Sequence, residues 1–89
     1  MRFEWDEEKR LINLEKHQID FVDAQDLFDG REVVEIDSTY EFETRKQRTG
    51  YIEGRMVTAV WTPREDAIRI ISVRSARDAE KRKYRELYG

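Results

Sequence analysis

The stretch RIISVRSARDAEKRKY, residues 69–84, decides how the second half of the chain folds. It opens with β-branched and apolar residues, which are typical of a strand, and ends in charged residues, which are typical of an exposed helix. Ser75 and Asp78 have the spacing of a capping box, which closes the first turn of a helix. The stretch therefore predicts a strand over residues 67–74, followed by a helix that runs to about Leu87.

The residues before this stretch predict further strands. Residues 55–62 are apolar on both faces, as expected of a strand in the middle of a sheet. A strand over residues 46–52 precedes them, with a hairpin turn at residues 53–54. Another strand is expected over residues 32–37, joined to the next by a polar link over residues 38–44. Neighbouring strands should be antiparallel, because a parallel return needs about a dozen or more connecting residues.

Residues 2–5 alternate in the way of a short strand, and the residues from Asp6 to Gly30 then follow a helical period. Asp6 offers an N-cap for a helix that runs to about His17. Apolar residues then recur at helical spacing over residues 21–28, and Asp29 and Gly30 close this second, short helix. We therefore expect an N-terminal helical hairpin.

Together these elements predict one α+β domain over residues 1–89. The sequence contains no internal repeat and no linker that would divide it. The hairpin and the C-terminal helix should pack on a small, mainly antiparallel sheet. We expect residues 55–62 and 67–74 to occupy the centre of that sheet. Only 38% of the residues are hydrophobic and 42% are charged, so the core should be thin.

Composition limits the classes of site that the chain can hold. It has no cysteine, which excludes disulfides and thiolate metal sites, and its one histidine argues against a zinc site built from protein ligands. We therefore expect no metal ion and no cofactor. No apolar run approaches the roughly 18 residues of a membrane span, and the N-terminus lacks the apolar core of a signal peptide. A cytoplasmic protein without membrane contact is expected.

The net charge of −3 conceals two oppositely charged halves. Residues 1–44 hold 5 Lys and Arg against 14 Asp and Glu, whereas residues 45–89 hold 12 against 6. A basic half gathered on one surface would attract phosphates, although the acidic whole argues against a general nucleic-acid binder. The alternative is that the two halves neutralise each other in the fold.

Several separated motifs bring in a family resemblance. The opening WDEEKRLINLEKH carries a W-D-x-x-K pattern, an asparagine and a K-H pair, and E-x-R, G-R, T-x-R and R-I-I-S-x-R follow in order. In this spacing and order the chain resembles the BrnT toxins of type II toxin–antitoxin systems over nearly its whole length. Gln18 stands where the family usually has Gly, and Val73 where it usually has Ala. The matching positions are Trp5, Asp6, Lys9, Asn13, Lys16, His17, Glu43, Arg45, Gly54, Arg55, Thr62, Arg64, Arg69, Arg74, Glu80 and Tyr84.

The resemblance implies a RelE-like fold and a metal-independent endoribonuclease that arrests growth. It also implies a ribbon-helix-helix antitoxin of the BrnA type as partner, RNA as substrate, and contact with operator DNA only through the antitoxin. The Gln18 departure bears on the end of the first helix, because a left-handed backbone costs a non-glycine residue roughly 1 kcal/mol or more.

Arginines are the strongest candidates for the chemistry. Cleavage of RNA without a metal needs a base for the 2′-hydroxyl, positive charge at the transition state and an acid for the leaving oxygen. Guanidinium groups match phosphate oxygens in pairs, so Arg74 and Arg64 are candidate catalytic groups. The plain alternative for every one of these side chains is a salt bridge to a carboxylate. Further candidates for phosphate binding are Arg45, Arg69, Arg77 and Lys16.

The two arginines of RIISVR should differ in role. They are five residues apart, so on a regular strand they face opposite sides and share a surface only if a bulge intervenes. Arg74 lies at the strand end, where the free N–H groups of the next helix favour an anion, and we expect it to meet phosphate. Arg69 lies further inside the sheet and should be paired.

Three other side chains are candidate proton carriers. His17 has the only unperturbed pKa that suits a base at neutral pH, yet its place at a helix end equally suits a structural role. Glu80 and Tyr84 are four residues apart and share a helix face, so either could carry a proton or simply pair on the surface.

Two classes of function remain open. In the first, the chain is a ribonuclease toxin. In the second, it is a catalytically silent partner that binds an antitoxin and acts only in transcriptional autoregulation. The retained Arg, His and Glu side chains favour the first, and the sequence pI of about 5.2 leaves the second open.

Overall fold

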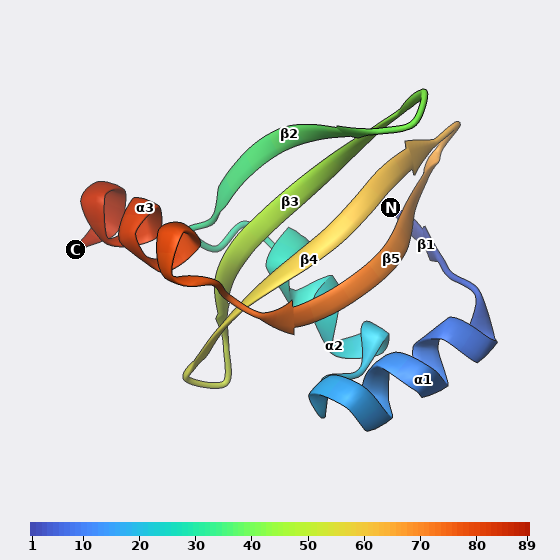
Figure 1. The fold of residues 1–89 in the computed structure, drawn as a ribbon, viewed down its shortest axis with the longest axis horizontal. Helices are drawn as coiled ribbons and strands as arrows, with labels where there is room; N and C mark the ends of the chain where they lie inside the picture. Colours follow the sequence, from blue (N-terminus) through green and yellow to red (C-terminus); the bar gives the residue numbers. More distant parts are fainter.

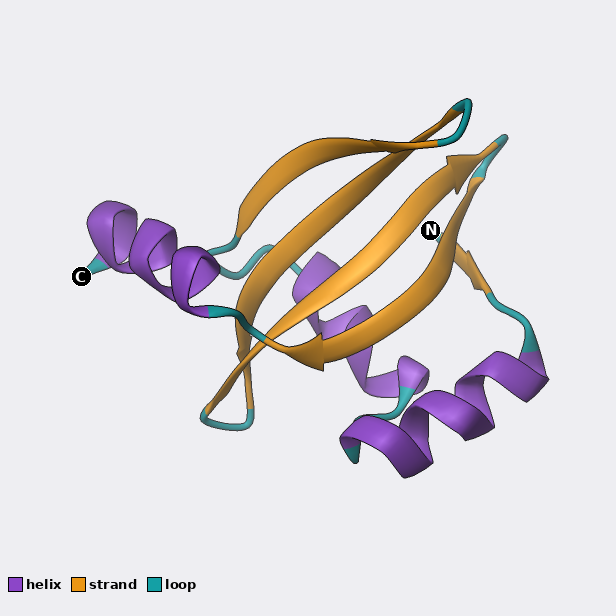
Figure 2. Ribbon diagram, in the orientation of Figure 1, coloured by secondary structure: helices purple, strands orange, loops and turns teal.

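The computed structural model describes all residues from 1 to 89 and contains one five-stranded sheet with three α-helices (Figures 1 and 2). The strand order is β1-β5-β4-β3-β2; β1 runs parallel to β5, and the other neighbours are antiparallel. The predicted α+β class and the largely antiparallel sheet are therefore confirmed. The elements are β1 (Arg2–Glu4), α1 (Glu7–His17), α2 (Phe21–Ala24), the 3-10 helix η1 (Gln25–Phe28), β2 (Val34–Tyr40), β3 (Glu43–Ile52), β4 (Arg55–Arg64), β5 (Ala67–Ser75) and α3 (Asp78–Tyr88).

The sheet has two unlike faces. One of them, the core face, carries the buried side chains of β4 and β5 and packs against Phe21 and Leu27 from the helical segments. The opposite side, the open face, meets only α3, which crosses one end of β3 while α2 lies behind the sheet (Figure 1). A second, small core of Met56, Ala76 and Tyr84 joins α3 to this face. The strand residues of the core face are Ile52, Val57, Ala59, Trp61, Ile68, Ile70 and Val73.

The two predicted central strands lie inside the sheet. β4 is the middle strand, and β5 is flanked by β4 and β1, so neither is an edge strand. The predicted polar link over residues 38–44 is wrong, however. β2 continues to Tyr40 and β3 begins at Glu43, which leaves only a tight turn between them. Serine and threonine in this segment continue the ladder because Ser38 pairs with Arg45 across the two strands.

The start of α3 also differs from the prediction. The helix begins at Asp78 with Arg77 as N-cap, and Ser75 still belongs to β5, so the predicted capping box of Ser75 and Asp78 is wrong. The physical reason is that the Ala76 N–H donates to the Met56 carbonyl at 3.0 Å, which prolongs the strand pairing. Glu80 takes the capping role instead, since its carboxylate accepts the Arg77 N–H at 2.8 Å.

The N-terminal helices begin and end near the expected residues. Asp6 caps α1 by accepting the Lys9 N–H at 3.1 Å, as predicted. The predicted second helix is short, because α2 has four residues and continues as η1. The expected helical hairpin is therefore not confirmed as such. The two segments are joined by an ion pair from Arg10 to Asp20, the N-cap of α2, at 2.8 Å.

Gln18 ends α1 in a left-handed conformation with φ 57° and ψ 33°. This is the backbone geometry that glycine usually supplies at a helix end. The Gln18 N–H donates to the Leu14 carbonyl at 2.8 Å, and its side-chain amide donates to the Glu15 carbonyl at 2.6 Å. These bonds hold the strained residue in place, so the glycine-type turn is kept without glycine.

A β-bulge in β5 places Arg69 and Arg74 on the same face. Trp61 pairs with Ile70 and Val60 with Ser72, which leaves Ile71 as an extra residue. Thr62 and Thr58 are four residues apart on β4 and face one side, and they pair with Arg69 and Arg74 respectively. The bulge thereby cancels the odd spacing of the two arginines.

Asn13 holds the bulged segment from the side of α1. Its buried amide nitrogen donates to the carbonyls of Val73 at 2.9 Å and Ile19 at 3.2 Å. Its oxygen accepts the Val73 N–H and the Ser72 hydroxyl, both at 3.3 Å. The side chain thus replaces a neighbouring strand where β1 has already ended.

No helix in the structure has the length and apolar character needed to cross a membrane.

Candidate functional site

Arg74 and Glu80 form the most closely bonded charged pair of the open face. β5 presents Arg74, α3 presents Glu80, and the two groups make a bidentate contact with N–O distances of 2.8 and 2.9 Å. The side chains are only 13% and 12% exposed. The Thr58 hydroxyl of β4 donates to the same carboxylate at 2.9 Å and meets the Thr49 hydroxyl at 2.7 Å. Two strands and one helix therefore fix the direction of the guanidinium.

The pKa of Glu80 is about 2, compared with an ordinary value of 4.5. Burial acts to raise it, but hydrogen bonds from Arg74, the Arg77 N–H and Thr58 favour the charged form and outweigh burial. Glu80 is therefore an anion near neutral pH. It is a weak base, and it has no proton to donate as an acid. Its chemical role is to orient Arg74, whose guanidinium has further N–H donors for another anion.

His17 lies in a positively charged environment at the end of α1. Burial lowers its pKa below the ordinary 6.5, and the positive charges of Lys16, Arg74 and Arg55 lower it further. Arg55 is held nearby, since it donates to the His17 carbonyl at 3.3 Å and to the Ser75 hydroxyl at 2.6 Å. The imidazole is therefore neutral at pH 7 and able to accept a proton.

Arg45 and Arg64 lie at the other end of the open face. Both contact Glu43, with N–O distances of 3.4 and 3.3 Å respectively. The Arg45 guanidinium also stacks over the Tyr40 ring, 4.3 Å from its centroid. Because Arg64 is six residues beyond Thr58 along β4, this cluster is about 20 Å from the Arg74 end of the face. The structure therefore does not bring Arg64 together with Arg74.

The remaining predicted residues fall into different places. Arg69 lies between the two ends and donates to Glu4 at 3.3 Å, so it is paired. The Arg77 guanidinium and Lys16 are exposed and form no ion pair. Tyr84 is buried between the rings of Tyr51 and Tyr88, and burial raises the pKa of its hydroxyl. Its surroundings are those of a core residue.

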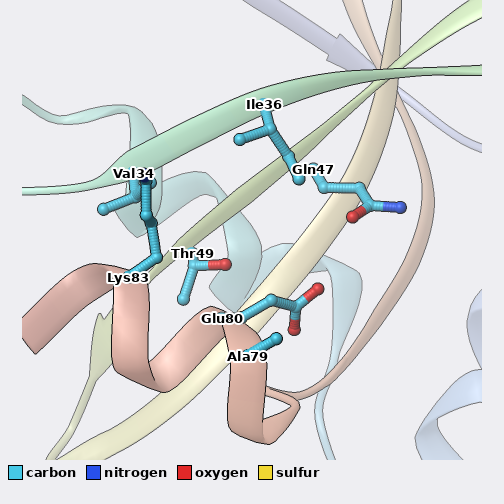
Figure 3. A pocket seen from close by; sticks show the side chains of 7 residues that line it. All are labelled: Val34, Ile36, Gln47, Thr49, Ala79, Glu80 and Lys83. Atoms are coloured by element: carbon cyan, nitrogen blue, oxygen red, sulfur yellow. The ribbon is translucent and has the colours of Figure 1, made fainter.

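A cavity of about 250 Å³ adjoins the Arg74 and Glu80 pair (Figure 3). It lies between α3 and the strands β2 and β3. The picture shows Val34 and Ile36 on the β2 side and Ala79, Glu80 and Lys83 on α3, with Thr49 between them and Gln47 at one end beside Ile36.

Sequence reasoning missed Thr58, Arg55 and Gln47 as parts of this region. Thr58 stands in an apolar run that predicts a buried strand, and only the register that pairs it with Arg74 reveals its contact with Glu80. Arg55 was recognised only as part of the G-R turn motif, which assigns it no chemical role. Gln47 has no charge and no motif. A threonine inside an otherwise apolar strand was the one available hint, because a buried hydroxyl needs a partner.

The structure contains no group of three or more His, Cys, Asp or Glu side chains that could hold a metal ion. The polar groups of the open face include guanidinium, carboxylate, hydroxyl, amide and ammonium groups, with one imidazole at its border. Such groups can bind a polyanion, stabilise added negative charge and accept a proton.

The fold and the site together define a small α+β protein with an arginine-lined open sheet face. Residues 5–80 match the family model described as the ribonuclease toxin BrnT of type II toxin–antitoxin systems. The match spans most of the chain, so the chain belongs to the BrnT family, whose members are ribonuclease toxins with an antitoxin partner. A comparison with curated proteins finds no match.

Proposed function

We propose that the chain is a metal-independent endoribonuclease that binds single-stranded RNA on its open face and cuts it beside Arg74. The observation that supports this most is the bidentate contact of Glu80 with Arg74, because it fixes a cation that retains free donors. A preoriented cation stabilises the extra negative charge of the transition state without reorganising during the reaction.

In this mechanism His17 accepts the proton of a ribose 2′-hydroxyl, whose oxygen attacks the neighbouring phosphorus. The bond from phosphorus to the 5′-oxygen breaks, and that oxygen takes a proton from solvent. The products are a 2′,3′-cyclic phosphate and a 5′-hydroxyl. Arg74 stabilises the pentavalent phosphorus, and Lys16 and Arg77 attract the strand. Glu80 is a positioning residue, and Tyr84 belongs to the core that supports α3.

Arg69, Arg45 and Arg64 extend the positive surface along the open face, where they would contact phosphates further along the strand. Each is paired with a carboxylate of β1 or β3, so RNA must compete for part of its donor set. A contact of this kind positions the strand and carries no sequence information.

The proposed partner is a ribbon-helix-helix antitoxin of the BrnA type, which covers the open face in the cytoplasm and carries the complex to operator DNA. Electrostatic complementarity supports this arrangement, since an arginine-lined face selects an acidic partner surface. Co-production with the neighbouring gene product should give a stable complex that cuts no RNA.

A catalytically silent antitoxin partner is the second candidate function. The observation that favours it is that Arg45, Arg64, Arg69 and Arg74 all carry ion pairs, which occupy the donors that RNA would need. Such a chain would bind its antitoxin and leave RNA intact.

Cleavage of a labelled single-stranded RNA in EDTA separates the two functions. We expect the wild-type protein to cut this RNA. The Arg74→Lys variant keeps the positive charge but loses the paired N–H donors of the guanidinium, so it should cut at least about tenfold more slowly. The exposed Arg82→Lys of α3 is the matched control and should keep the wild-type rate. Cutting that requires added Mg²⁺, or an Arg74→Lys variant with full activity, would contradict the mechanism. Wild-type protein that binds antitoxin but cuts nothing would establish the silent partner.

The pH dependence of the same reaction tests His17. Its lowered pKa means that the ring loses its proton, and becomes a base, at a pH below 6.5. Cleavage should therefore rise with pH through a midpoint below 6.5 and then level off. His17→Gln should remove this rise, whereas a wild-type midpoint above 7 would assign the base to another group.

A further inference from the structure

The cavity between α3 and the strands β2 and β3 has the size of a site for one small group. Its volume of about 250 Å³ lies below the roughly 300–1,000 Å³ of pockets for drug-sized ligands. Val34 and Ile36 on β2 face Ala79 on α3 across it, which gives two apolar walls (Figure 3). An aromatic ring held between apolar side chains is stabilised by burial of both its faces.

Only part of the polar lining is already bonded within the protein. Thr49 meets the Thr58 hydroxyl, and Glu80 is occupied by Arg74, Thr58 and the Arg77 N–H. The half-buried Gln47 and the exposed Lys83 form no side-chain hydrogen bond or ion pair within the protein, so both groups are open to solvent or to a ligand. The cavity thus offers one group that can both donate and accept, and one free cation.

We propose that this cavity binds a single base of the RNA strand, next to the phosphate that Arg74 holds. The proposal rests on the proposed ribonuclease function and adds the site that selects where the strand is cut. The Gln47 amide reads the hydrogen-bonding edge of the base, the apolar walls hold its faces, and Lys83 binds the adjoining phosphate. Proteins recognise single-stranded RNA in this way, with unstacked bases held by stacking and by bonds to their edges.

Charge supports a nucleotide as the occupant in preference to an apolar side chain. Lys83 lines the cavity, and Arg74 adjoins it through its ion pair with the lining residue Glu80, so a phosphate attached to the base meets the Lys83 ammonium beside a neutralised ion pair. An apolar side chain of a partner protein would leave the Lys83 charge and the Gln47 amide without partners as they lose water.

Binding is tested by NMR titration of the protein with each of the four ribonucleoside 5′-monophosphates. Ribose 5-phosphate, which lacks the base, is the comparison ligand. We expect at least one nucleotide to shift the Gln47 side-chain amide and Thr49 signals, with ribose 5-phosphate leaving them in place. Equal shifts with ribose 5-phosphate would mean a phosphate site only, and the absence of shifts would overturn the base site.

Filling the cavity provides the matched variants. Ala79→Leu places a larger exposed side chain in the wall and should weaken nucleotide binding at least about tenfold, the effect of losing one good contact. Glu86→Leu adds the same side chain to α3 outside the cavity and should bind as the wild type does. Thermal melts establish that both are folded. Unchanged binding by a folded Ala79→Leu variant would contradict the proposal.

The pattern of cut sites tests the role of Gln47 in selection. Gln47→Leu should change the ratio of cutting between RNAs that differ in the base beside the cut by about tenfold, because one hydrogen-bonding partner is lost. Glu86→Leu should keep the wild-type ratio. Cleavage with an unaltered ratio in Gln47→Leu would remove the base site but keep the ribonuclease. A wild-type chain that cuts no RNA yet binds nucleotides at Gln47 would keep the base site and remove the ribonuclease function.

Discussion

Gln18 is the residue whose backbone most clearly departs from its own preference. Replacing it by glycine should raise the free energy of unfolding by about 1 kcal/mol, because glycine adopts the left-handed conformation without a steric cost. Urea unfolding measures the change. Gln18→Ala is the control, since it keeps the strain but loses the bond to Glu15, and it should be less stable than the wild type. A glycine variant no more stable than the wild type would show that the side-chain bond offsets the strain.

Asn13 is expected to be the most sensitive polar residue of the core. Asn13→Ala should lower the free energy of unfolding by about 2–3 kcal/mol, because it leaves the buried Val73 N–H and carbonyl without partners. Asn13→Asp keeps the acceptor and loses the donor, so it should also destabilise. Thermal melts check both, and a loss below about 0.5 kcal/mol, the level of an ordinary surface change, would contradict this role.

The residue scale also shows what the sequence could and could not predict. The N-cap Asp6 and the paired Arg69 were predicted and are found, because each depends on local spacing or on depth in the sheet. The contact of Thr58 with Glu80 was not predicted, since it joins residues 22 apart through a register that no local pattern encodes. Arg74 was expected to meet phosphate, with a salt bridge to a carboxylate as the alternative, and the structure shows it paired with Glu80.

At the scale of elements, α3 is attached to the sheet by a small apolar cluster and by Glu80. The pKa of Glu80 is lowered from 4.5 to about 2 in the folded protein, so its charged form stabilises the fold above pH 4.5. That contribution falls as the pH drops from 4.5 and is lost below about 2. It amounts to about 3 kcal/mol, because the shift is about 2.5 pKa units and each unit corresponds to about 1.36 kcal/mol.

Glu80→Gln isolates this effect from the other carboxylates. The difference in unfolding free energy between wild type and variant should have its largest value at pH 7. It should decrease steadily as the pH falls from 4.5 to 2. Glu86→Gln, a change at an exposed carboxylate of the same helix, should leave the wild-type profile unchanged. A difference independent of pH would mean that Glu80 contributes through packing and not through charge.

Elements were predicted best where one period runs unbroken. β4 and β5 were placed within a few residues because their apolar runs are long, and α1 because the Asp6 N-cap marks its start. The β2 to β3 turn and the α3 N-cap were misplaced, since serine and threonine fit both strands and caps, and the pairing of Ala76 with Met56 decides between them. The sequence showed only that a bulge would be needed to place Arg69 and Arg74 on one face. It could not predict the bulge itself, because a one-residue excess in β5 depends on how β5 pairs with β4.

At the scale of the whole molecule, the acidic first half and the basic second half neutralise each other in part. Five ion pairs join an acidic residue of the first half to a basic residue of the second half and lie on the sheet. The sequence left open whether the basic half forms a surface or pairs internally, and the structure shows that both occur. The pairs are Arg45–Glu43, Lys46–Asp37, Arg48–Glu35, Arg64–Glu43 and Arg69–Glu4.

Salt should therefore weaken the folded state. Raising NaCl from about 0.1 M to about 1 M shortens the screening length from about 10 Å to about 3 Å. Because half-exposed pairs contribute up to about 1 kcal/mol each, unfolding free energy should fall by about 1–3 kcal/mol in total. Glu43→Gln removes the partner of two of the five pairs and should show a smaller response. Stability that rises with NaCl in both proteins would contradict the prediction.

At Ile71 the chain carries one residue more than β4 needs to pass from Thr62 to Thr58. In alignment terms, a relative with one residue fewer between Arg69 and Arg74 would pair regularly with β4 and still present both arginines on the open face. A β5 of the present length without the bulge would instead place them on opposite sides. Spacings of five and of four are thus equivalent for this site, and a one-residue gap within RIISVR is no sign that a relative has lost it.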